Sequence, residues 1–307
     1  MSANPFGREE VPTSSLCYRV TRVCNLDCPF CQAPTTSDDL LYEADMFDSS
    51  GRAKELTLEE HFMILDSLEE THIESIKFTG GEPFVYPGFS EILERANDLG
   101  FDIVTCSNGT LLDEDSLECL SENQSRVKIS LHGVNGEHDQ ILKSAPEDVI
   151  KESIRRLGSA GIYTSIHTII TEYNKEHLDD LFAFALENGV RKVTLIPMIP
   201  RGKGVNTMEY AVPDEECRTI HQRMKQKYGD QLKVSYLDLY EKTYFSLESD
   251  GVIYGEKENE RLDDTIVDMR EYAWDTNSDE SLSGPETAVD CSRDQPHPSE
   301  VSSHQTK

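Results

Sequence analysis

Three cysteines lie close together near the start of the chain, in the stretch VCNLDCPFCQ. Three residues separate Cys24 from Cys28, and two separate Cys28 from Cys31. Thiolates are common protein ligands of zinc and of iron–sulfur clusters, but three of them do not complete a tetrahedral site. Either a fourth ligand lies elsewhere in the chain, or the remaining position is left open for a small molecule.

These two interpretations predict different sites. A zinc ion would need a fourth ligand, for which Cys17 and His61 are the nearby candidates, and neither falls in a familiar zinc-ligand spacing. A [4Fe–4S] cluster held by three thiolates keeps one iron open, as a catalytic metal keeps one position vacant. The remaining cysteines are dispersed, so the sequence predicts one cluster and no second: they are Cys17, Cys106, Cys119, Cys217 and Cys291.

Two polar segments that follow predicted strands could bind a small molecule. TGGEP follows the strand SIKF, and Gly80 and Gly81 allow the backbone to approach a ligand closely. Glu82 beside them supplies a carboxylate that can accept a hydrogen bond from an ammonium group. SNG follows the strand FDIVTC, and Ser107 and Asn108 offer short polar side chains for hydroxyl groups, although Ser-Asn-Gly alone is more typical of a turn.

The elements that must position these segments alternate between strand and helix. A capping-box pattern at TLEE begins a helix at Thr57, and six strand–helix steps follow one another up to about Tyr228. Such alternation is typical of parallel strands with helical crossovers, and the Gly-x-Gly-x-x-Gly turn of a dinucleotide fold is missing. The sequence therefore predicts an α/β fold, a partial (β/α)6 TIM-type barrel.

The chain divides into four predicted parts. Residues 1–12 are a flexible N-terminus, and residues 13–230 form the core barrel. Residues 231–272 form a small C-terminal β appendage, in which YFSLESDGVIYG folds as a hairpin at Asp250-Gly251. Residues 273–307 are rich in Ser, Asp, Glu and Pro and short of large apolar residues, so we predict a disordered acidic tail.

Composition limits the classes of partner. Acidic residues number 58 and basic ones 29, for a net charge of −29, which argues against a nucleic-acid or anionic-lipid surface. No apolar run is long enough for a signal peptide or a membrane span, so we expect no membrane partner and a cytoplasmic location. The acidity suits a halophilic, salt-rich cell interior, although an ordinary acidic protein is the alternative.

The cysteine stretch, with Phe30 before the third cysteine, resembles the cluster loop of radical S-adenosylmethionine (SAM) enzymes. TGGEP and SNG end the second and third predicted strands, where that family places its SAM-binding loops. The resemblance covers about Leu16 to Gly204. It implies that Cys24, Cys28 and Cys31 hold a [4Fe–4S] cluster, and that SAM contacts Phe30, Gly80, Gly81, Glu82, Pro83, Ser107, Asn108, Ser130, Ile196 and Met198.

Some of these roles have plain alternatives. Ser130 could be a buried hydroxyl bonded to the backbone, and Ile196 and Met198 could belong to the apolar core. Arg201 and Lys203 are candidates for a substrate carboxylate or phosphate because basic residues are scarce here, although they could pair with surface acids. His132 and His167 stay outside the predicted site, because a lone histidine near a strand end is more often structural than catalytic.

The resemblance also implies a reaction: reductive cleavage of SAM to methionine and a 5′-deoxyadenosyl radical, which abstracts hydrogen from a substrate. SLHGVNGEHDQI and PRGKG look most like the branch of molybdenum-cofactor, pyrroloquinoline-quinone, heme and peptide maturases, but without cysteines for auxiliary clusters. A small-molecule or peptide substrate and a ferredoxin- or flavodoxin-like electron donor are then expected. The alternatives are a viperin-like nucleotide-modifying enzyme and a regulator that binds a cluster and SAM without turnover.

Overall fold

The computed structural model describes residues 11–32, 55–142, 146–237, 244–256 and 264–270. Strands and helices alternate along them in the predicted order. The strands are β1 (Ser15–Arg19), β2 (Ser75–Thr79), β3 (Asp102–Ser107), β4 (Arg126–Ser130), β5 (Thr164–Ile170), β6 (Lys192–Pro197), β7 (Lys233–Tyr236), β8 (Tyr244–Leu247), β9 (Val252–Glu256) and β10 (Asp264–Asp268). The α-helices are α2 (Leu58–Glu69), α3 (Phe89–Asp98), α4 (Glu114–Glu122), α5 (Glu137–Ile141), α6 (Glu147–Ser159), α7 (Leu178–Glu187) and α8 (Asp214–Tyr228).

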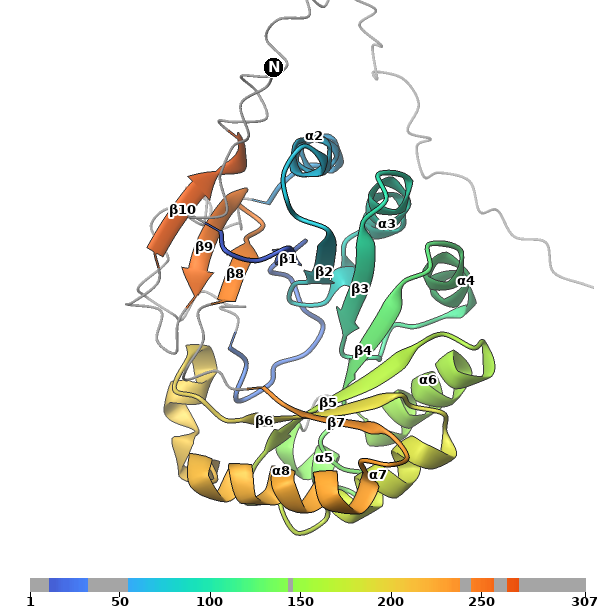
Figure 1. Cartoon of the computed structure of the whole chain (residues 1–307), viewed down its shortest axis with the longest axis vertical. Helices are drawn as coiled ribbons and strands as arrows, with labels where there is room; N and C mark the ends of the chain where they lie inside the picture. Colours follow the sequence, from blue (N-terminus) through green and yellow to red (C-terminus); the bar gives the residue numbers. More distant parts are fainter. Residues whose placement is uncertain (1–10, 33–54, 143–145, 238–243, 257–263, 271–307) are drawn as a thin grey trace, which may run out of the picture.

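All described strands belong to one curved sheet, in the order β10-β9-β8-β1-β2-β3-β4-β5-β6-β7. Neighbours from β1 to β7 pair in parallel, as the helical crossovers require. Figure 1 shows the sheet curling around an interior with the helices on its outer face. The predicted α/β class and the partial TIM-type barrel are thereby confirmed.

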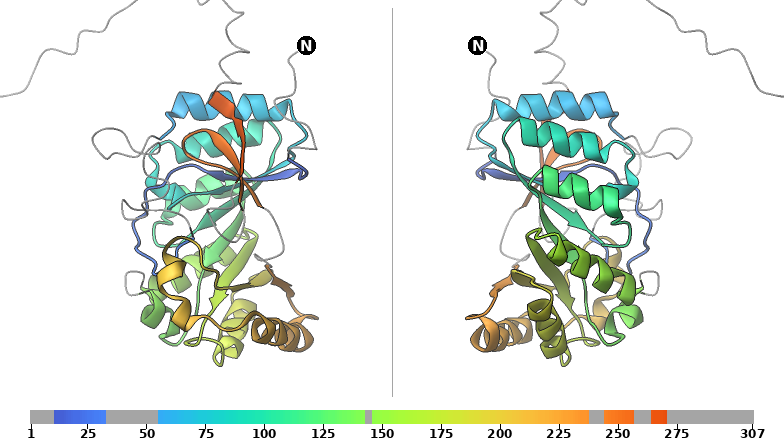
Figure 2. Two further views of the ribbon diagram at one scale, coloured as in Figure 1. Left: turned by 90° about the vertical axis from the view of Figure 1, so that its left-hand side faces the viewer. Right: turned by 90° about the vertical axis from the view of Figure 1, so that its right-hand side faces the viewer.

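Local sequence signals explain where the helices begin. The capping box at Thr57 is present: its hydroxyl accepts from the backbone N–H of Glu60, and the Glu60 carboxylate accepts from the backbone N–H of Thr57. Asp113 caps α4 by accepting from the backbone N–H of Ser116. Figure 2 shows α2, α3 and α4 stacked along one flank of the sheet. Their buried apolar residues belong to the main hydrophobic core.

The C-terminal strands extend the barrel sheet at both edges. β8 pairs in parallel with β1, with Cys17 opposite Ser246, and β7 pairs in parallel with β6. The hairpin expected at Asp250-Gly251 is confirmed, because β8 and β9 pair antiparallel on either side of it. The division of the chain into four parts stays a prediction, and most of the N-terminal part and the whole acidic tail lie outside the described residues. No helix in the described ranges is both long and apolar enough to cross a membrane.

Candidate active site

A cavity of about 570 Å³ lies inside the curved sheet and extends to the polar loops that follow the strands. It brings together segments that are far apart in the sequence. Of the residues predicted from the sequence, those that line it are Cys24, Cys28, Phe30, Cys31, Gly80, Gly81, Glu82, Ser107, Asn108, Ser130, Ile196 and Arg201.

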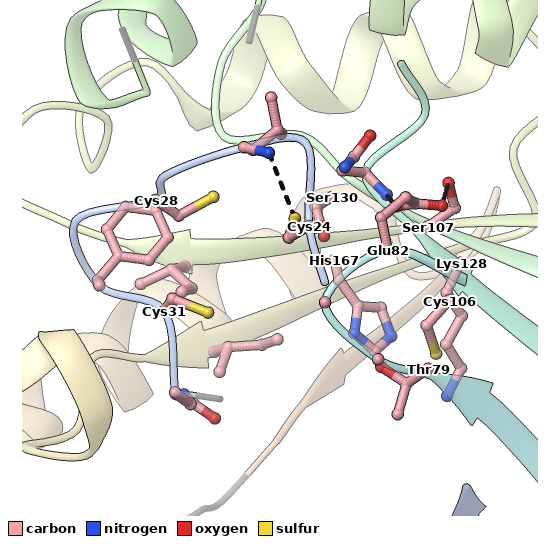
Figure 3. Close-up of a pocket in the computed structure, with 18 of the residues that line it drawn as sticks. Cys24, Cys28, Cys31, Thr79, Glu82, Cys106, Ser107, Lys128, Ser130 and His167 are labelled. Carbon is pink, nitrogen blue, oxygen red and sulfur yellow. Dashed lines mark hydrogen bonds between the residues drawn. The ribbon is translucent and has the colours of Figure 1, made fainter. Parts of the chain in front are cut away.

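The three cysteines lie on the loop that follows β1. The backbone N–H of Cys31 donates to the carbonyl of Cys28 at 3.2 Å, and the N–H of Leu26 donates to Sγ of Cys24 at 3.4 Å. Figure 3 shows the thiols of Cys28 and Cys31 directed from the loop toward the space beside Cys24. The loop therefore presents three sulfurs to one cavity.

The electrostatics of this loop fit a cationic iron–sulfur cluster. Burial, together with the repulsion from Cys31 and Cys24, raises the pKa of Cys28 to about 12. Burial also raises the pKa of Cys24. Iron would supply the positive charge that thiolates at this position need. The donor set and its setting thus suit a cluster bound through three thiolates.

Neither candidate for the fourth ligand of a zinc ion, Cys17 or His61, lies on the cysteine loop. His61 lies in α2, and its Nδ1 is 2.7 Å from the hydroxyl of Tyr18. Tyr18 is buried on one face of β1, and the side chain of Cys17 lies on the other face. Cys17 itself lines the cavity, but from within β1 and not from the cysteine loop. Among the described residues, no three His, Cys, Asp or Glu side chains are grouped to hold a single metal ion.

The glycines of TGGEP make room for the segment that leads into the cysteine loop. The N–H of Gly81 donates to the carbonyl of Thr21 at 2.7 Å, and the N–H of Glu82 donates to that of Val23 at 3.0 Å. A Cβ on Gly81 would lie 2.3 Å from the carbonyl oxygen of Val23, and one on Gly80 would lie 2.6 Å from that of Thr21. Any larger side chain would therefore push the loops apart.

Glu82 joins the TGGEP loop to the SNG loop. Its carboxylate accepts from the hydroxyl of Ser107 at 2.9 Å and from the backbone N–H of Asn108 at 2.7 Å. The residue has no exposed surface in the folded chain, and burial raises the pKa of its carboxyl to about 7, while the bonds from Asn108, Ser107 and Phe84 act to lower it. Glu82 is thus held in place by the next strand's loop at the edge of the cavity.

Side-chain amides join the SNG loop back to the cysteine loop. Nδ2 of Asn108 donates to Oδ1 of Asn25 at 2.9 Å, and Nδ2 of Asn25 donates to the hydroxyl of Thr110 at 2.8 Å. Each of the three loops, the cysteine, TGGEP and SNG loops, is therefore hydrogen-bonded to the other two.

The PRGKG segment after β6 holds the other end of the cysteine loop. The N–H of Lys203 donates to the carbonyl of Cys31 at 2.9 Å, and the hydroxyl of Thr207 donates to that of Pro29 at 3.2 Å. Gly202 has a φ of +57°, and a Cβ there would lie 2.3 Å from the carbonyl oxygen of Cys31. Only glycine fits this contact without displacing the loop.

Three of the predicted site residues do not line the cavity. Pro83 is buried at the start of a short 3-10 helix. Met198 packs into the main apolar core, which was the alternative to a SAM contact for this residue. Lys203 forms an ion pair with Asp27 outside the cavity, whereas Arg201 does line it and lies 3.6 Å from the carboxylate of Glu256.

Other cavity residues were missing from the predicted site. His132 and His167, which were set aside, both line it, as does His138. The ring of His132 contacts Phe30 edge-on at 5.1 Å and stacks on His138 at 5.3 Å. Burial lowers the pKa of all three histidines, so they are neutral near pH 7. The inner faces of the strands also contribute Cys17, Lys77, Cys106, Lys128, Lys192 and Thr194.

Comparison with known proteins identifies the family. The family model described as the radical SAM superfamily matches residues 18–185, more than half of the chain. A probable GTP 3′,8-cyclase of Sulfurisphaera tokodaii is 28% identical over 232 residues, covering 75% of this chain and 68% of that protein. An AdoMet-dependent heme synthase of Methanosarcina barkeri is 29% identical over 210 residues, covering 67% and 56%. The sporulation killing factor maturation protein SkfB of Bacillus subtilis is 27% identical over 228 residues, covering 72% and 52%.

Solved structures show the same fold. SuiB of Streptococcus suis bound to S-adenosylmethionine superposes with a TM-score of 0.66 at 14% identity, over 78% of this chain and 59% of that one. The protein anSMEcpe with bound AdoMet and a Cp18Cys peptide gives 0.63 at 16% identity, over 86% and 80%. The chain spans roughly half to two thirds of the length of the relatives named above.

Proposed function

Because this chain belongs to the radical SAM superfamily, we propose that it binds one [4Fe–4S] cluster through Cys24, Cys28 and Cys31 and cleaves SAM reductively. When bound, the cluster supplies the electron that splits SAM into methionine and a 5′-deoxyadenosyl radical, which abstracts hydrogen from the substrate. The observation that carries the proposal is that three thiols and two strand-end loops face one cavity. Hydrogen bonds join these two loops to each other and to the cysteine loop.

The chain's own residues bind and orient SAM beside the thiols. Glu82 holds the SNG loop and lies at the cavity edge, where a carboxylate favours an ammonium group. Ser107, Asn108 and Ser130 present hydroxyl and amide groups suited to a ribose. The remaining proposed contacts are apolar or backbone ones, from Phe30, Gly80, Gly81 and Ile196, while Pro83 and Met198 act by holding these segments in place.

The substrate occupies the deeper part of the same cavity. Reaction inside a curved sheet shields a reactive species from water, which is what hydrogen abstraction requires. The named relatives include a heme synthase and a maturation protein, and anSMEcpe was solved with a bound peptide, so a cofactor precursor or a peptide is the substrate class we propose. A low-potential electron donor of the ferredoxin or flavodoxin kind must deliver the electron.

The test is a cleavage assay on protein reconstituted with iron and sulfide without oxygen. The reduced protein, incubated with SAM, should release 5′-deoxyadenosine and methionine in equal amounts. Protein that carries about four irons per chain and binds SAM, yet forms no 5′-deoxyadenosine with or without a substrate extract, would instead support a regulator that binds both groups without turnover.

A further inference from the structure

Three lysines point from alternate strands into the cavity. Lys77 lies in β2, Lys128 in β4 and Lys192 in β6, and all three line it. In β2 and β4 the neighbouring residues are buried apolar side chains on the outer face, so strand alternation turns the lysines inward. We call Lys77, Lys128 and Lys192 the inner lysines.

None of the inner lysines forms a hydrogen bond or ion pair with another described residue. This is unexpected in a chain with twice as many acidic as basic residues. Lysines on the outer surface do find carboxylates: Lys151 pairs with Glu147, and Lys227 pairs with Asp179. Within the part of the chain that the structure describes, no carboxylate therefore pairs with these three converging ammonium groups.

The inner lysines are near enough to act on one another. Lys128 and Lys192 lie on the two strands that flank Ser165 in register, which places their backbones about 10 Å apart. Burial lowers the pKa of Lys192, and Lys128 lowers it further. Like charges inside a cavity repel, and the repulsion is relieved when an anion binds between them.

Two neutral groups and the local carboxylates complete this part of the cavity. Nε2 of His167 and the hydroxyl of Thr194 are buried, line the cavity and have no hydrogen-bond partner among the described residues. Two carboxylates among the described residues line the cavity, and each accepts a hydrogen bond from another side chain: Glu82 from Ser107, and Glu256 from Ser246. Among the described lining residues, an anion bound between the inner lysines would have hydrogen-bond donors as neighbours and no carboxylate that lacks another partner.

We propose that the inner lysines bind an acid group of the substrate, a phosphate or a carboxylate, while the rest of the substrate extends toward the cysteine loop. Figure 3 shows Lys128, Cys106 and His167 on the far side of the cavity from Cys28 and Cys31. The cavity thus has a thiol end and a basic end. This inference rests on the proposed function only in taking the cavity to be the substrate site.

The test measures anion binding and not turnover. Thermal unfolding of the full-length reconstituted chain is followed during titration with pyrophosphate, and separately with succinate, at constant ionic strength set with sodium chloride. At least one of the two anions should raise the melting temperature of the wild type in proportion to ln(1 + [L]/Kd). A response to pyrophosphate points to a phosphate-bearing substrate, and a response to succinate points to a carboxylate.

Two variants make the result specific. The triple variant Lys77→Met, Lys128→Met, Lys192→Met should lose the anion response and, without anion, should melt at or above the wild-type temperature because the repulsion is gone. Lys225→Met, an exposed lysine on α8, should keep the full response. The proposal is overturned if neither anion stabilises the wild type, if the triple variant responds equally, or if it melts well below the wild type. SAM cleavage by the wild type is scored separately, so failure of the proposed function is distinguishable.

Discussion

The carboxylate of Glu82 accepts a hydrogen bond from the hydroxyl of Ser107 at 2.9 Å, across the ends of two neighbouring parallel strands. The same carboxylate accepts the backbone N–H of Asn108, so its two oxygens fix the loop after β3 from the loop after β2. A residue expected to contact SAM thereby acquires a second role, that of setting the distance between two proposed SAM-binding loops.

The first prediction concerns pH. The folded chain raises the pKa of Glu82 from 4.5 to about 7, so between these values the folded state binds more protons than the unfolded state. The contribution of Glu82 to the free energy of unfolding is therefore fully present below about pH 4.5. It is lost as the pH rises through about 7, and the loss is on the order of 3 kcal/mol. Glu82→Gln should flatten the fall in melting temperature between pH 5 and 8, measured without SAM.

Other buried groups titrate too, so the comparison is between variants. Glu94→Gln, on the exposed face of α3, serves as the control and should leave the wild-type pH profile unchanged. Parallel profiles for Glu82→Gln and the wild type would show that Glu82 is ionised in the folded chain throughout this range.

A second prediction concerns the contact between Gly202 and the cysteine loop. Gly202→Ala should lower iron content after reconstitution severalfold, because the new Cβ meets the carbonyl oxygen of Cys31. Gly161→Ala is a matched control, since Gly161 also has a positive φ but nothing lies within 4 Å of its Cβ position. In chemical denaturation, the positive φ should cost each variant about 1–2 kcal/mol, and Gly202→Ala should lose more because of its contact with Cys31. Equal iron contents in the two variants would show that the contact does not position the thiols.

A third prediction concerns a buried ion pair that ties the C-terminal strands to the segment before the cysteines. Glu248 accepts from Arg19 at 2.7 Å and from Arg22 at 2.5 Å, and these three side chains are largely buried. Glu248→Gln takes the carboxylate away from the buried Arg22 and leaves Arg19 only its contact with Glu256 at 3.1 Å. The change should cost about 3–5 kcal/mol of unfolding free energy. The exposed pair Arg155–Glu152 is the control, and Glu152→Gln should cost under about 1 kcal/mol. Similar costs for the two changes would contradict the assignment of Glu248 to the core.

The fourth prediction concerns the thiols themselves. Single changes Cys24→Ala, Cys28→Ala and Cys31→Ala should each abolish the brown absorbance of the cluster and SAM cleavage, because two thiolates cannot hold it. Cys119→Ala, on the half-buried side of α4, should keep both. A wild-type iron content in any of the three loop variants would remove that cysteine from the ligand set.

Much of this fold follows from local sequence signals. The capping box at Thr57, the strand–helix alternation and the hairpin at Asp250-Gly251 are short-range patterns, and all three are confirmed. The parallel pairing of β8 with β1 joins residues more than two hundred positions apart, and no local pattern specifies it. What looked like an appendage in the sequence therefore continues the barrel sheet.

The parts of the candidate site that could be predicted from the sequence are the loops that carry recognisable motifs. The cysteine, TGGEP and SNG segments do meet at the cavity, whereas Met198 does not reach it because β6 ends at Pro197 and strand alternation stops there. The inner lysines were predictable in principle, since each stands at an inward position of a strand, but recognising them requires knowing which face of the sheet is concave. Their clustering comes from the curvature of the sheet and not from any single segment.

We propose that three thiols leave one iron of the cluster open and that SAM occupies it. The most direct measurement is electron–nuclear double resonance on the reduced, reconstituted protein with SAM carrying 15N in its amino group. We expect a resolved 15N coupling to the cluster, and its loss when unlabelled SAM replaces the labelled compound. A reduced four-iron signal with SAM bound, as shown by equilibrium dialysis, but without any 15N coupling would contradict it.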